Sequence, residues 1–355
     1  MQENDNILNL LKEKGAEAAR SALRGVILQP GAIGDCILTL PLAEFMKDCL
    51  GLGGVDIFGH TEYIGIFPGR TCVDSIRSID SVDLHRLFAE TNTFDLVDGD
   101  ALINVFGDYA WIVTFLGEPD SNFEQNLIFT ANCSRSSEVI TLSMKPSEKS
   151  SAHISDFYIQ QFIAQSGLSL EPRQVRQAKS LIKATKTDIN KGRELLEEIN
   201  VDSSEKLVVI QPGSGGSHKR CHLENFLVVA EELVSKNIQV IFLLGPAESE
   251  QFSDATLAVL LRKIEAAGAK CLTDLSLTQV LELLSCADAF LGNDSGITHL
   301  AAAIGVKTIA IFGPTDPKIY SPVGPAVTVL ASRNADFAQK PSVKLQKKLL
   351  ETLTA

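Results

Sequence analysis

The chain has 355 residues, of which 45% are hydrophobic and 21% charged, a composition typical of a folded globular protein. Its length exceeds what one hydrophobic core usually supports and therefore predicts two domains. The formal net charge is −12; residues 1–165 hold 11 basic against 23 acidic residues, whereas residues 166–355 hold 21 of each kind. Nucleic-acid binding needs a basic face, so this balance argues against a nucleic-acid partner but leaves room for local basic patches.

Cysteine usage and hydropathy point to the cytoplasm. Seven cysteines, an odd number, are scattered through expected strands and helices, which fits reduced thiols better than a disulfide framework. No apolar run reaches the roughly 18 residues that suggest a membrane span. The first residues mix acidic and basic side chains and do not resemble a signal peptide. We therefore expect a cytoplasmic protein.

The first half reads as a helical extension over residues 1–24 followed by an α/β domain over residues 25–170. The domain begins with a strand at Gly25–Gln29 and a turn, PGAIGD, that leads into an apolar helix. Residues 117–149 show only weak periodicity. Further strands are expected at Val55–Phe58, Ser75–Ile79, Ala101–Val105 and Ile112–Phe115.

The second half repeats this opening. A helix at Ser155–Gln165 and a connector at Ser169–Gln174 lead to a second domain, residues 171–330, and a C-terminal helical segment, residues 331–355. VVIQPGSGG in this domain parallels VILQPGAIGD in the first, which predicts two doubly wound units. The remaining expected elements are helices at Leu223–Ser235, Glu248–Ala267, Leu277–Cys286 and Ser342–Thr354, and a strand at Ile238–Leu244.

The run GNDSGITHLAAAIGVKTIAIFGPT, residues 292–315, predicts a strand, a phosphate-binding turn, a helix and a second strand. The strands are expected at Ala287–Leu291 and Lys307–Phe312. Asp294 and Ser295 are favoured helix N-cap types, and Gly296 lets a ligand approach the backbone. His299 falls in the first helical turn, where unpaired amides and the helix dipole favour a phosphate. The alternative is an ordinary strand–helix–strand crossover with a capped helix.

Together these motifs resemble the heptosyltransferases, family 9 of the glycosyltransferases. The resemblance covers roughly residues 25–325 and is carried by GDCILTLP, PGSGGSHKR, LLGPAESE, GNDSGITHLAAAIG and FGPTDPKIYSP, in that order. It implies an α/β fold of the GT-B type, with two facing Rossmann-like domains, a cleft between them, and the nucleotide sugar held mainly by the second. The implied reaction moves heptose from ADP-heptose to a lipopolysaccharide core with inversion, without a metal ion or cofactor. It also implies a glycolipid or saccharide acceptor and peripheral contact with the inner membrane.

Two residues carry the expected chemistry of sugar transfer. Asp35, at the family's GDxxLTxP aspartate, is the candidate base for the acceptor hydroxyl; its alternative is a helix cap. Lys219, at the end of a glycine-rich loop, is the candidate cation for the departing diphosphate, and its alternative is a solvated surface lysine. Ser214 and the backbone amides of Gly215 and Gly216 would add neutral donors.

The rest of the expected nucleotide-sugar site lies on the second domain. Glu248 follows a predicted strand, where a carboxylate can accept hydrogen bonds from ribose hydroxyls, and the family has a nucleotide-binding glutamate there. Leu277 is expected to pack on the base. Asp294 would contact hydroxyls or orient His299, while the amides of Ser295 and Gly296 and the imidazole of His299 address phosphate; a packing histidine is the alternative.

Two departures and one charge imbalance qualify the resemblance. Cys221 and Tyr320 stand where the family usually has Trp. His218, Cys221 and His222 are metal-ligand types, but three ligands on one short loop lack a clear fourth, so no metal site is predicted. The acidic first half predicts a less anionic acceptor than a phosphorylated inner core, since like charges repel. A nucleotide-sugar-binding protein, and an epimerase or hydrolase on the same fold, are the competing interpretations.

Overall fold

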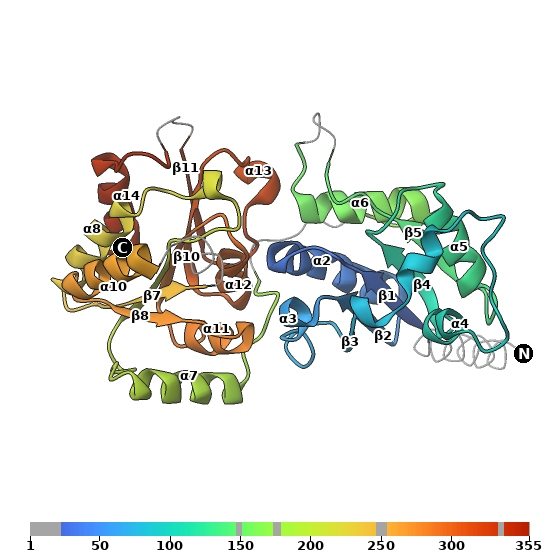
Figure 1. Cartoon of the computed structure of the whole chain (residues 1–355), viewed down its shortest axis with the longest axis horizontal. Coiled ribbons are helices and arrows are strands. Elements are labelled where there is room, and N and C mark those ends of the chain that lie inside the picture. Colours follow the sequence, from blue (N-terminus) through green and yellow to red (C-terminus); the bar gives the residue numbers. More distant parts are fainter. Residues whose placement is uncertain (1–22, 147–150, 173–178, 246–253, 333–336, 355) are drawn as a thin grey trace, which may run out of the picture. The chain divides into compact units, whose positions relative to one another are not determined.

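A computed structural model describes residues 23–146, 151–172, 179–245, 254–332 and 337–354 of the chain (Figure 1). It divides the chain into two compact units, residues 1–175 and 176–355. The expected helical extension, residues 1–24, lies almost wholly outside the described residues, and so do the last two residues of the connector at residues 169–174. Each unit is a parallel sheet with helices on both faces, so the predicted doubly wound α/β class is confirmed.

The first unit is a five-stranded sheet in the order β3-β2-β1-β4-β5, with every pair parallel. β1 and β2 are nearly or wholly buried, as expected of strands covered on both faces. The strands are β1 (Arg24–Leu28), β2 (Gly54–Gly59), β3 (Ser75–Ser78), β4 (Tyr109–Thr114) and β5 (Glu138–Thr141).

Helices cover both faces of this sheet. On one face α2 packs against α6. On the other, a core of Leu and Phe side chains joins β1 to α4, α5 and the short helices before them. The helices are α2 (Ile33–Leu50), α3 (Thr61–Ile64), η1 (Ile79–Ser81), η2 (Leu84–Phe88), α4 (Ala101–Phe106), α5 (Asn122–Ala131) and α6 (Ile154–Ser166).

The strand predicted at Ala101–Val105 is wrong, because these residues form helix α4. Asp100 caps this helix by accepting a hydrogen bond from the Leu102 amide at 3.0 Å. In a short apolar run, periodicity alone does not distinguish a strand from a buried helical turn. Here the N-cap residue Asp100 favours the helix.

The second unit is a six-stranded parallel sheet in the order β11-β10-β9-β6-β7-β8. Its strands run through the core, and β6 and β9 are completely buried. They are β6 (Leu207–Gln211), β7 (Gln239–Leu244), β8 (Lys270–Thr273), β9 (Ala289–Asn293), β10 (Lys307–Phe312) and β11 (Val327–Ala331).

Helices again cover both faces of the sheet. α8, α10 and α14 share one core with it, while α7 packs on α11 at the other face (Figure 1). The helix α7 had no counterpart among the predicted elements. The helices are α7 (Lys186–Glu198), η3 (Ser217–Lys219), α8 (Glu224–Val234), α10 (Asp254–Ala266), α11 (Leu277–Leu284), α12 (Gly296–Ile304), α13 (Pro317–Tyr320) and α14 (Val343–Thr354).

The strand orders create one switch point in each unit. The chain builds outward from β1 to β3 and then returns to place β4 on the other side of β1. The second unit does the same from β6 to β8 and then β9. Loops leave such neighbouring strands in opposite directions and open a crevice at their carboxyl ends, which is where open α/β sheets bind ligands.

Candidate functional site

At the switch point of the second unit, Asn293 ties together the loops that follow β6 and β9. Its side-chain amide donates to the Pro212 carbonyl at 2.6 Å, and its Oδ1 accepts from the Cys221 amide at 3.0 Å. Asn293 is fully buried. The loop at residues 212–221 is therefore held against the end of β9, although it lies some 70 to 80 residues away in sequence.

Two hydroxyl groups reinforce this connection. Ser295 Oγ donates to Gln211 Oε1 at 2.8 Å, and Ser214 Oγ donates to the Asp294 carbonyl at 2.7 Å. Ser214, expected to be a ligand donor, thus uses its proton inside the protein and is buried. Gly215 has the opposite surroundings, since a Cβ placed there would meet nothing within 4 Å. The loop consequently has a fixed end at Ser214 and open space at Gly215.

Lys219 and His299 both face the carboxylate of Asp294. Lys219 Nζ lies 2.8 Å from Asp294 Oδ2, and His299 Nε2 lies 3.8 Å from Oδ1. The side chains of Asp294 and His299 are each 5% exposed, whereas that of Lys219 is 32% exposed. Burial by itself raises the pKa of the Asp294 carboxyl, but the neighbouring imidazole and ammonium outweigh it and lower the pKa to about 2. Asp294 is therefore an anion that positions a partly exposed ammonium.

The N-terminus of α12 lies directly beside this ion pair. Ser295 is the N-cap and accepts from the Thr298 amide, so Gly296 is the first helical residue. The first amides of a helix have no partner within it and attract anions. The Nδ1 atom of His299 is buried without a hydrogen-bond partner among the described residues. A buried polar atom usually has a partner, so this nitrogen points to a ligand or a water at the site.

Two expected nucleotide contacts are farther from this cluster or outside the described part of the chain. Leu277 is the first residue of α11, half exposed, and follows the capping residue Ser276. It belongs to the segment after β8, at the sheet edge beyond β7. Glu248 lies outside the described residues.

Asp35 occupies the corresponding switch point of the first unit. It is the third residue of α2, half buried, and its Oδ2 accepts from the Ala32 amide at 3.2 Å. Ala32, not Asp35, is thus the N-cap residue. No described residue donates a hydrogen bond to Oδ1, so one carboxylate oxygen caps the helix while the other is available.

The loop before Asp35 is tightly built around Gly31. A Cβ at Gly31 would come within 2.7 Å of Asp35 Cβ and within 2.9 Å of Gln29 Oε1. The buried Gln29 accepts from the Gly31 amide at 2.9 Å and donates to Thr39 at 2.7 Å. This loop therefore constrains the position of the Asp35 side chain on the side of Gly31 and Ala32.

Cys221, one of the two positions where the family usually has Trp, lies in the core of the second unit. Cys221 is 4% exposed, packs in the core between the sheet and α8, and accepts a hydrogen bond from Asn225. Burial raises the pKa of its thiol to about 11, so it stays protonated at neutral pH. Among the described residues no group of three or more His, Cys, Asp and Glu side chains could hold a metal ion.

The sequence missed Gln211 and Asn293 as site residues. Gln211 is the glutamine of the repeated Gln-Pro-Gly segment, and Asn293 directly precedes Asp294 in the run GNDSGITHLAAAIG. Both residues therefore belong to motifs that the sequence already indicated. Their partners, Ser295 and Pro212, lie across the switch point, and the sequence does not reveal which strands are neighbours.

The model of glycosyltransferase family 9 (heptosyltransferase) matches residues 151–351, more than half of the chain. Among known proteins, lipopolysaccharide heptosyltransferase 2 of Salmonella typhimurium is 26% identical over 137 residues, which are 38% of this chain and 39% of that protein. Lipooligosaccharide heptosyltransferase 2 of Campylobacter jejuni is 31% identical over 114 residues, 32% of this chain and 35% of that protein. The matched segments thus span less than two fifths of the length of these curated relatives.

Solved structures agree on the fold. The glycosyltransferase family 9 protein of Veillonella parvula covers 94% of this chain and 96% of its own, with a TM-score of 0.69 at 17% identity. The ADP-heptose lipopolysaccharide heptosyltransferase II of Escherichia coli covers 94% and 98%, with a TM-score of 0.67 at 16% identity. These likenesses confirm the two-domain GT-B fold class. No described helix is long and apolar enough to span a bilayer.

Proposed function

The chain belongs to glycosyltransferase family 9, and from this premise we propose that it transfers a sugar, heptose from ADP-heptose, to a hydroxyl of a lipopolysaccharide core or another surface glycan. The observation that carries the proposal is the switch point of the second unit. There a partly exposed ammonium, a buried carboxylate and a helix N-terminus meet. A sugar diphosphate has the charge and the hydroxyls that this set of groups recognises.

In this proposal the second unit binds the donor. The amides at Ser295 and Gly296 and the ammonium of Lys219 contact the diphosphate, and the free Nδ1 of His299 supplies a further polar contact. Asp294 keeps Lys219 in place, so little side-chain entropy is lost when the phosphate arrives. Gly215 leaves room beside the loop for the ligand. Glu248 and Leu277 hold the ribose and the base.

The proposed chemistry is a single displacement. Asp35 accepts the proton of the acceptor hydroxyl as its oxygen forms a bond to the anomeric carbon. The bond from that carbon to the diphosphate oxygen breaks on the opposite face, which inverts the anomeric configuration. The electron pair stays with the diphosphate, where Lys219 and the amides of α12 stabilise the developing charge. Positive potential from these groups makes a metal ion unnecessary in the proposed step.

The charge of the first half of the chain bears on the choice of acceptor. The excess of acidic over basic residues in residues 1–165 favours an acceptor with few phosphates, such as an outer-core or other surface saccharide. Transfer to defined core fragments with and without phosphate groups tests this preference. Efficient transfer to the phosphorylated inner core alone would contradict it.

One assay separates the proposal from its two competitors. The protein is incubated with ADP-heptose, other nucleotide sugars and candidate acceptors, and released ADP and extended acceptor are measured. The proposal predicts nucleotide release that depends on the acceptor and equals product formed. Binding without turnover would indicate a nucleotide-sugar-binding protein, and turnover without acceptor an epimerase or hydrolase.

A further inference from the structure

The loop that carries Lys219 is held at its far end by Cys221. The Cys221 amide donates to Asn293 Oδ1 at 3.0 Å, and its sulfur accepts a hydrogen bond from Asn225 Nδ2 at 3.1 Å. Cys221 is 4% exposed, and Asn225, the second residue of α8, is 1% exposed. Lys219 lies two residues before Cys221 and five after Ser214, which holds the other end of the loop. The position of Lys219 therefore depends most on the contacts of Cys221.

Asn225 connects this loop to the C-terminal helix α14. Its Oδ1 accepts from the Ser342 amide at 2.7 Å and from Gln346 Nε2 at 3.2 Å. Ser342 directly precedes α14, and Gln346 is 9% exposed at the end of its first turn. An asparagine side chain offers one NH₂ group and one acceptor oxygen. Asn225 uses the first for the Cys221 thiol and the second for α14, so one buried side chain joins two segments that are distant in sequence.

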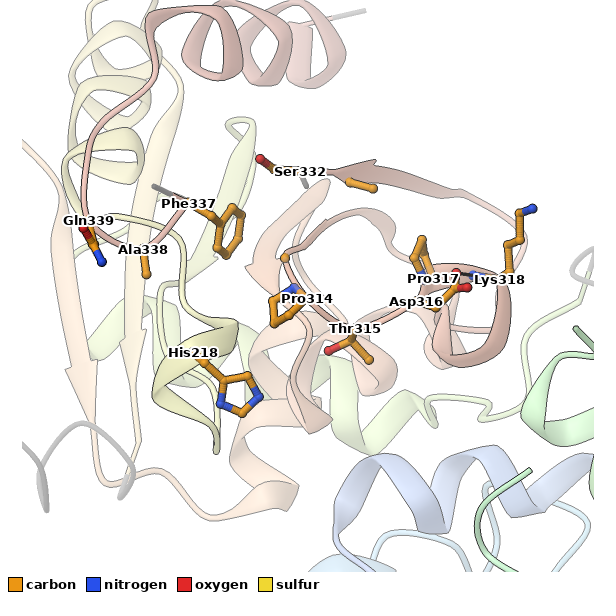
Figure 2. Close-up of a pocket in the computed structure, with 12 residues that line it drawn as sticks. His218, Pro314, Thr315, Asp316, Pro317, Lys318, Ser332, Phe337, Ala338 and Gln339 are labelled. Atoms are coloured by element: carbon orange, nitrogen blue, oxygen red, sulfur yellow. Dashed lines mark hydrogen bonds between the residues drawn. The ribbon is translucent and has the colours of Figure 1, made fainter. Parts of the chain in front are cut away.

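A backbone contact supports the same connection. The His222 amide donates to the Phe337 carbonyl at 3.3 Å. The Phe337 ring is 8% exposed and belongs to the same core as Leu349 of α14. Figure 2 shows Phe337 in the wall of the same cavity as His218, which is part of the loop. The loop and the chain that leads into α14 are thus joined by both side-chain and backbone hydrogen bonds.

The loop itself is closed by Arg220, which donates from Nε and Nη2 to the Ser214 carbonyl at 2.9 and 2.7 Å. Lys219 lies 2.8 Å from Asp294, and a shift of the Cys221 end would carry its ammonium away from this position. A buried polar network whose members are all satisfied makes a structure rigid, and loss of one member leaves its partners without a bond. The buried network behind Cys221 therefore controls where the ammonium lies.

We propose that Asn225 is a positioning residue of the donor site. It acts through Cys221 on Lys219, and it links donor binding to the packing of α14. This role rests on the proposed function, because Lys219 is there the contact of the diphosphate. Such linkage is reciprocal. If the packing of α14 favours the loop conformation that binds a diphosphate, a bound diphosphate must favour the packing of α14.

A double-mutant cycle tests whether Asn225 acts through Lys219. Leu has the branched shape of Asn but makes no hydrogen bond, so Asn225→Leu should weaken ADP binding about threefold to tenfold, the effect of about one hydrogen bond. In the Lys219→Ala background the same substitution should change the affinity by less than about 1.5-fold. The measurement is calorimetric titration of the full-length protein with ADP. Losses that add in the double variant would overturn the proposal.

Thr308→Val is the control for a general loss of stability. Thr308 is fully buried in the same unit and donates to the Val306 carbonyl at 2.8 Å, at the amino end of β10 and thus at the opposite edge of the sheet from the loop. This variant should unfold at a lower temperature and bind ADP as the wild type does. Equal losses of affinity in Thr308→Val and Asn225→Leu would show an effect of stability alone and contradict the assignment.

Gln346→Leu approaches the network from α14 and serves if Asn225→Leu does not fold. It removes one hydrogen bond to Asn225 and keeps the one from the Ser342 amide. ADP binding should weaken about twofold, since part of the network remains. Wild-type affinity in the folded Gln346 variant would also overturn the proposal.

Hydrogen exchange of the full-length protein measures the reciprocal effect. With saturating ADP, the amides of α14 should exchange about threefold more slowly, and those of α7, which packs on α11, should change less. In Asn225→Leu the extra protection of α14 should disappear. Equal protection of both helices, or none in α14, would contradict the link while leaving the donor site in place. A wild-type protein that does not bind ADP would overturn the proposed function, and with it this role of Asn225.

Discussion

The two units begin with the same local sequence and use it differently. In the first, Gln29 bonds within its own loop and helix, to the Gly31 amide and to Thr39. In the second, Gln211 accepts from Ser295 on the loop of the neighbouring strand. The same Gln-Pro-Gly segment thus holds a single carboxylate in one unit and joins two loops in the other.

This difference separates two tasks. The first switch point presents Asp35 with one oxygen available, which suits proton acceptance. The second assembles Lys219, Asp294 and the start of α12, which suits binding of a diphosphate. We therefore expect substitutions in the first unit to affect turnover and those in the second to affect donor affinity.

Replacing Asp35 with Asn should lower the rate of transfer by about 10²-fold or more, because the amide cannot accept the acceptor's proton. The substitution keeps the size of the side chain and an oxygen that can still cap the helix. The measurement is steady-state release of ADP in the presence of acceptor. A rate within threefold or so of the wild type would remove Asp35 from the mechanism.

Replacing Lys219 with Ala should weaken donor binding about 10- to 100-fold, the effect expected when a charged hydrogen bond to a phosphate is lost. The rate should fall as well, since the departing diphosphate loses the same contact. Calorimetric titration of ADP-heptose measures the affinity. Lys236→Ala, at an exposed lysine of the same unit, is the matched control. Unaltered affinity in the Lys219 variant would make it a surface lysine.

Replacing Gly31 with Ala should lower the rate about tenfold while leaving donor affinity unchanged. The new Cβ would lie 2.7 Å from Asp35 Cβ, so the carboxylate must move, and misplacement by about 1 Å costs up to 10²-fold in rate. Gly215→Ala tests the second loop, where the added Cβ meets nothing within 4 Å. That variant should unfold at the wild-type temperature, and any loss should appear in donor affinity. Loss of donor affinity in Gly31→Ala, together with a lower rate at unchanged affinity in Gly215→Ala, would contradict the assignment of turnover to the first unit and donor binding to the second.

The stability of the second unit should depend on pH through Asp294. Its folded pKa of about 2 lies below the usual 3.8, so ionised Asp294 stabilises the fold above pH 4. The contribution is of order 2 kcal/mol and is lost as the pH falls from about 4 to 2. Urea unfolding of the wild type and Asp294→Asn should therefore differ at pH 7 and converge only as the pH falls to about 2. A difference independent of pH would mean that the ion pair is not its cause.

Much of this fold could be predicted from the sequence because buried parallel strands form continuous apolar runs. The runs at residues 25–29 and 307–312 correspond closely to β1 and β10. Hydrophobic periodicity predicted the wrong element where a short apolar run follows a helix-capping residue, as at α4. Hydrophobic periodicity also missed α7. The residues of this helix are mostly polar and exposed, and its position is set by its packing on α11.

The candidate site was predictable as residue types but not as an arrangement. Lys219 and Asp294 are 75 positions apart, and the adjacency of β6 and β9 brings them within 2.8 Å. Because β6 and β9 are neighbours, the Ser214 hydroxyl also reaches the Asp294 carbonyl, a contact that no local sequence pattern predicts. Cys221, which stands where the family usually has Trp, proves to be a core residue. Glu248 stays a prediction.

The central claim is that the second unit binds the donor and the first supplies the base. Its most direct test is the dissociation constant of ADP-heptose for Asp35→Asn, measured beside that for Lys219→Ala. We predict a wild-type dissociation constant for the Asp35 variant and one raised about tenfold or more for the Lys219 variant. A large increase for Asp35→Asn together with none for Lys219→Ala would contradict the account.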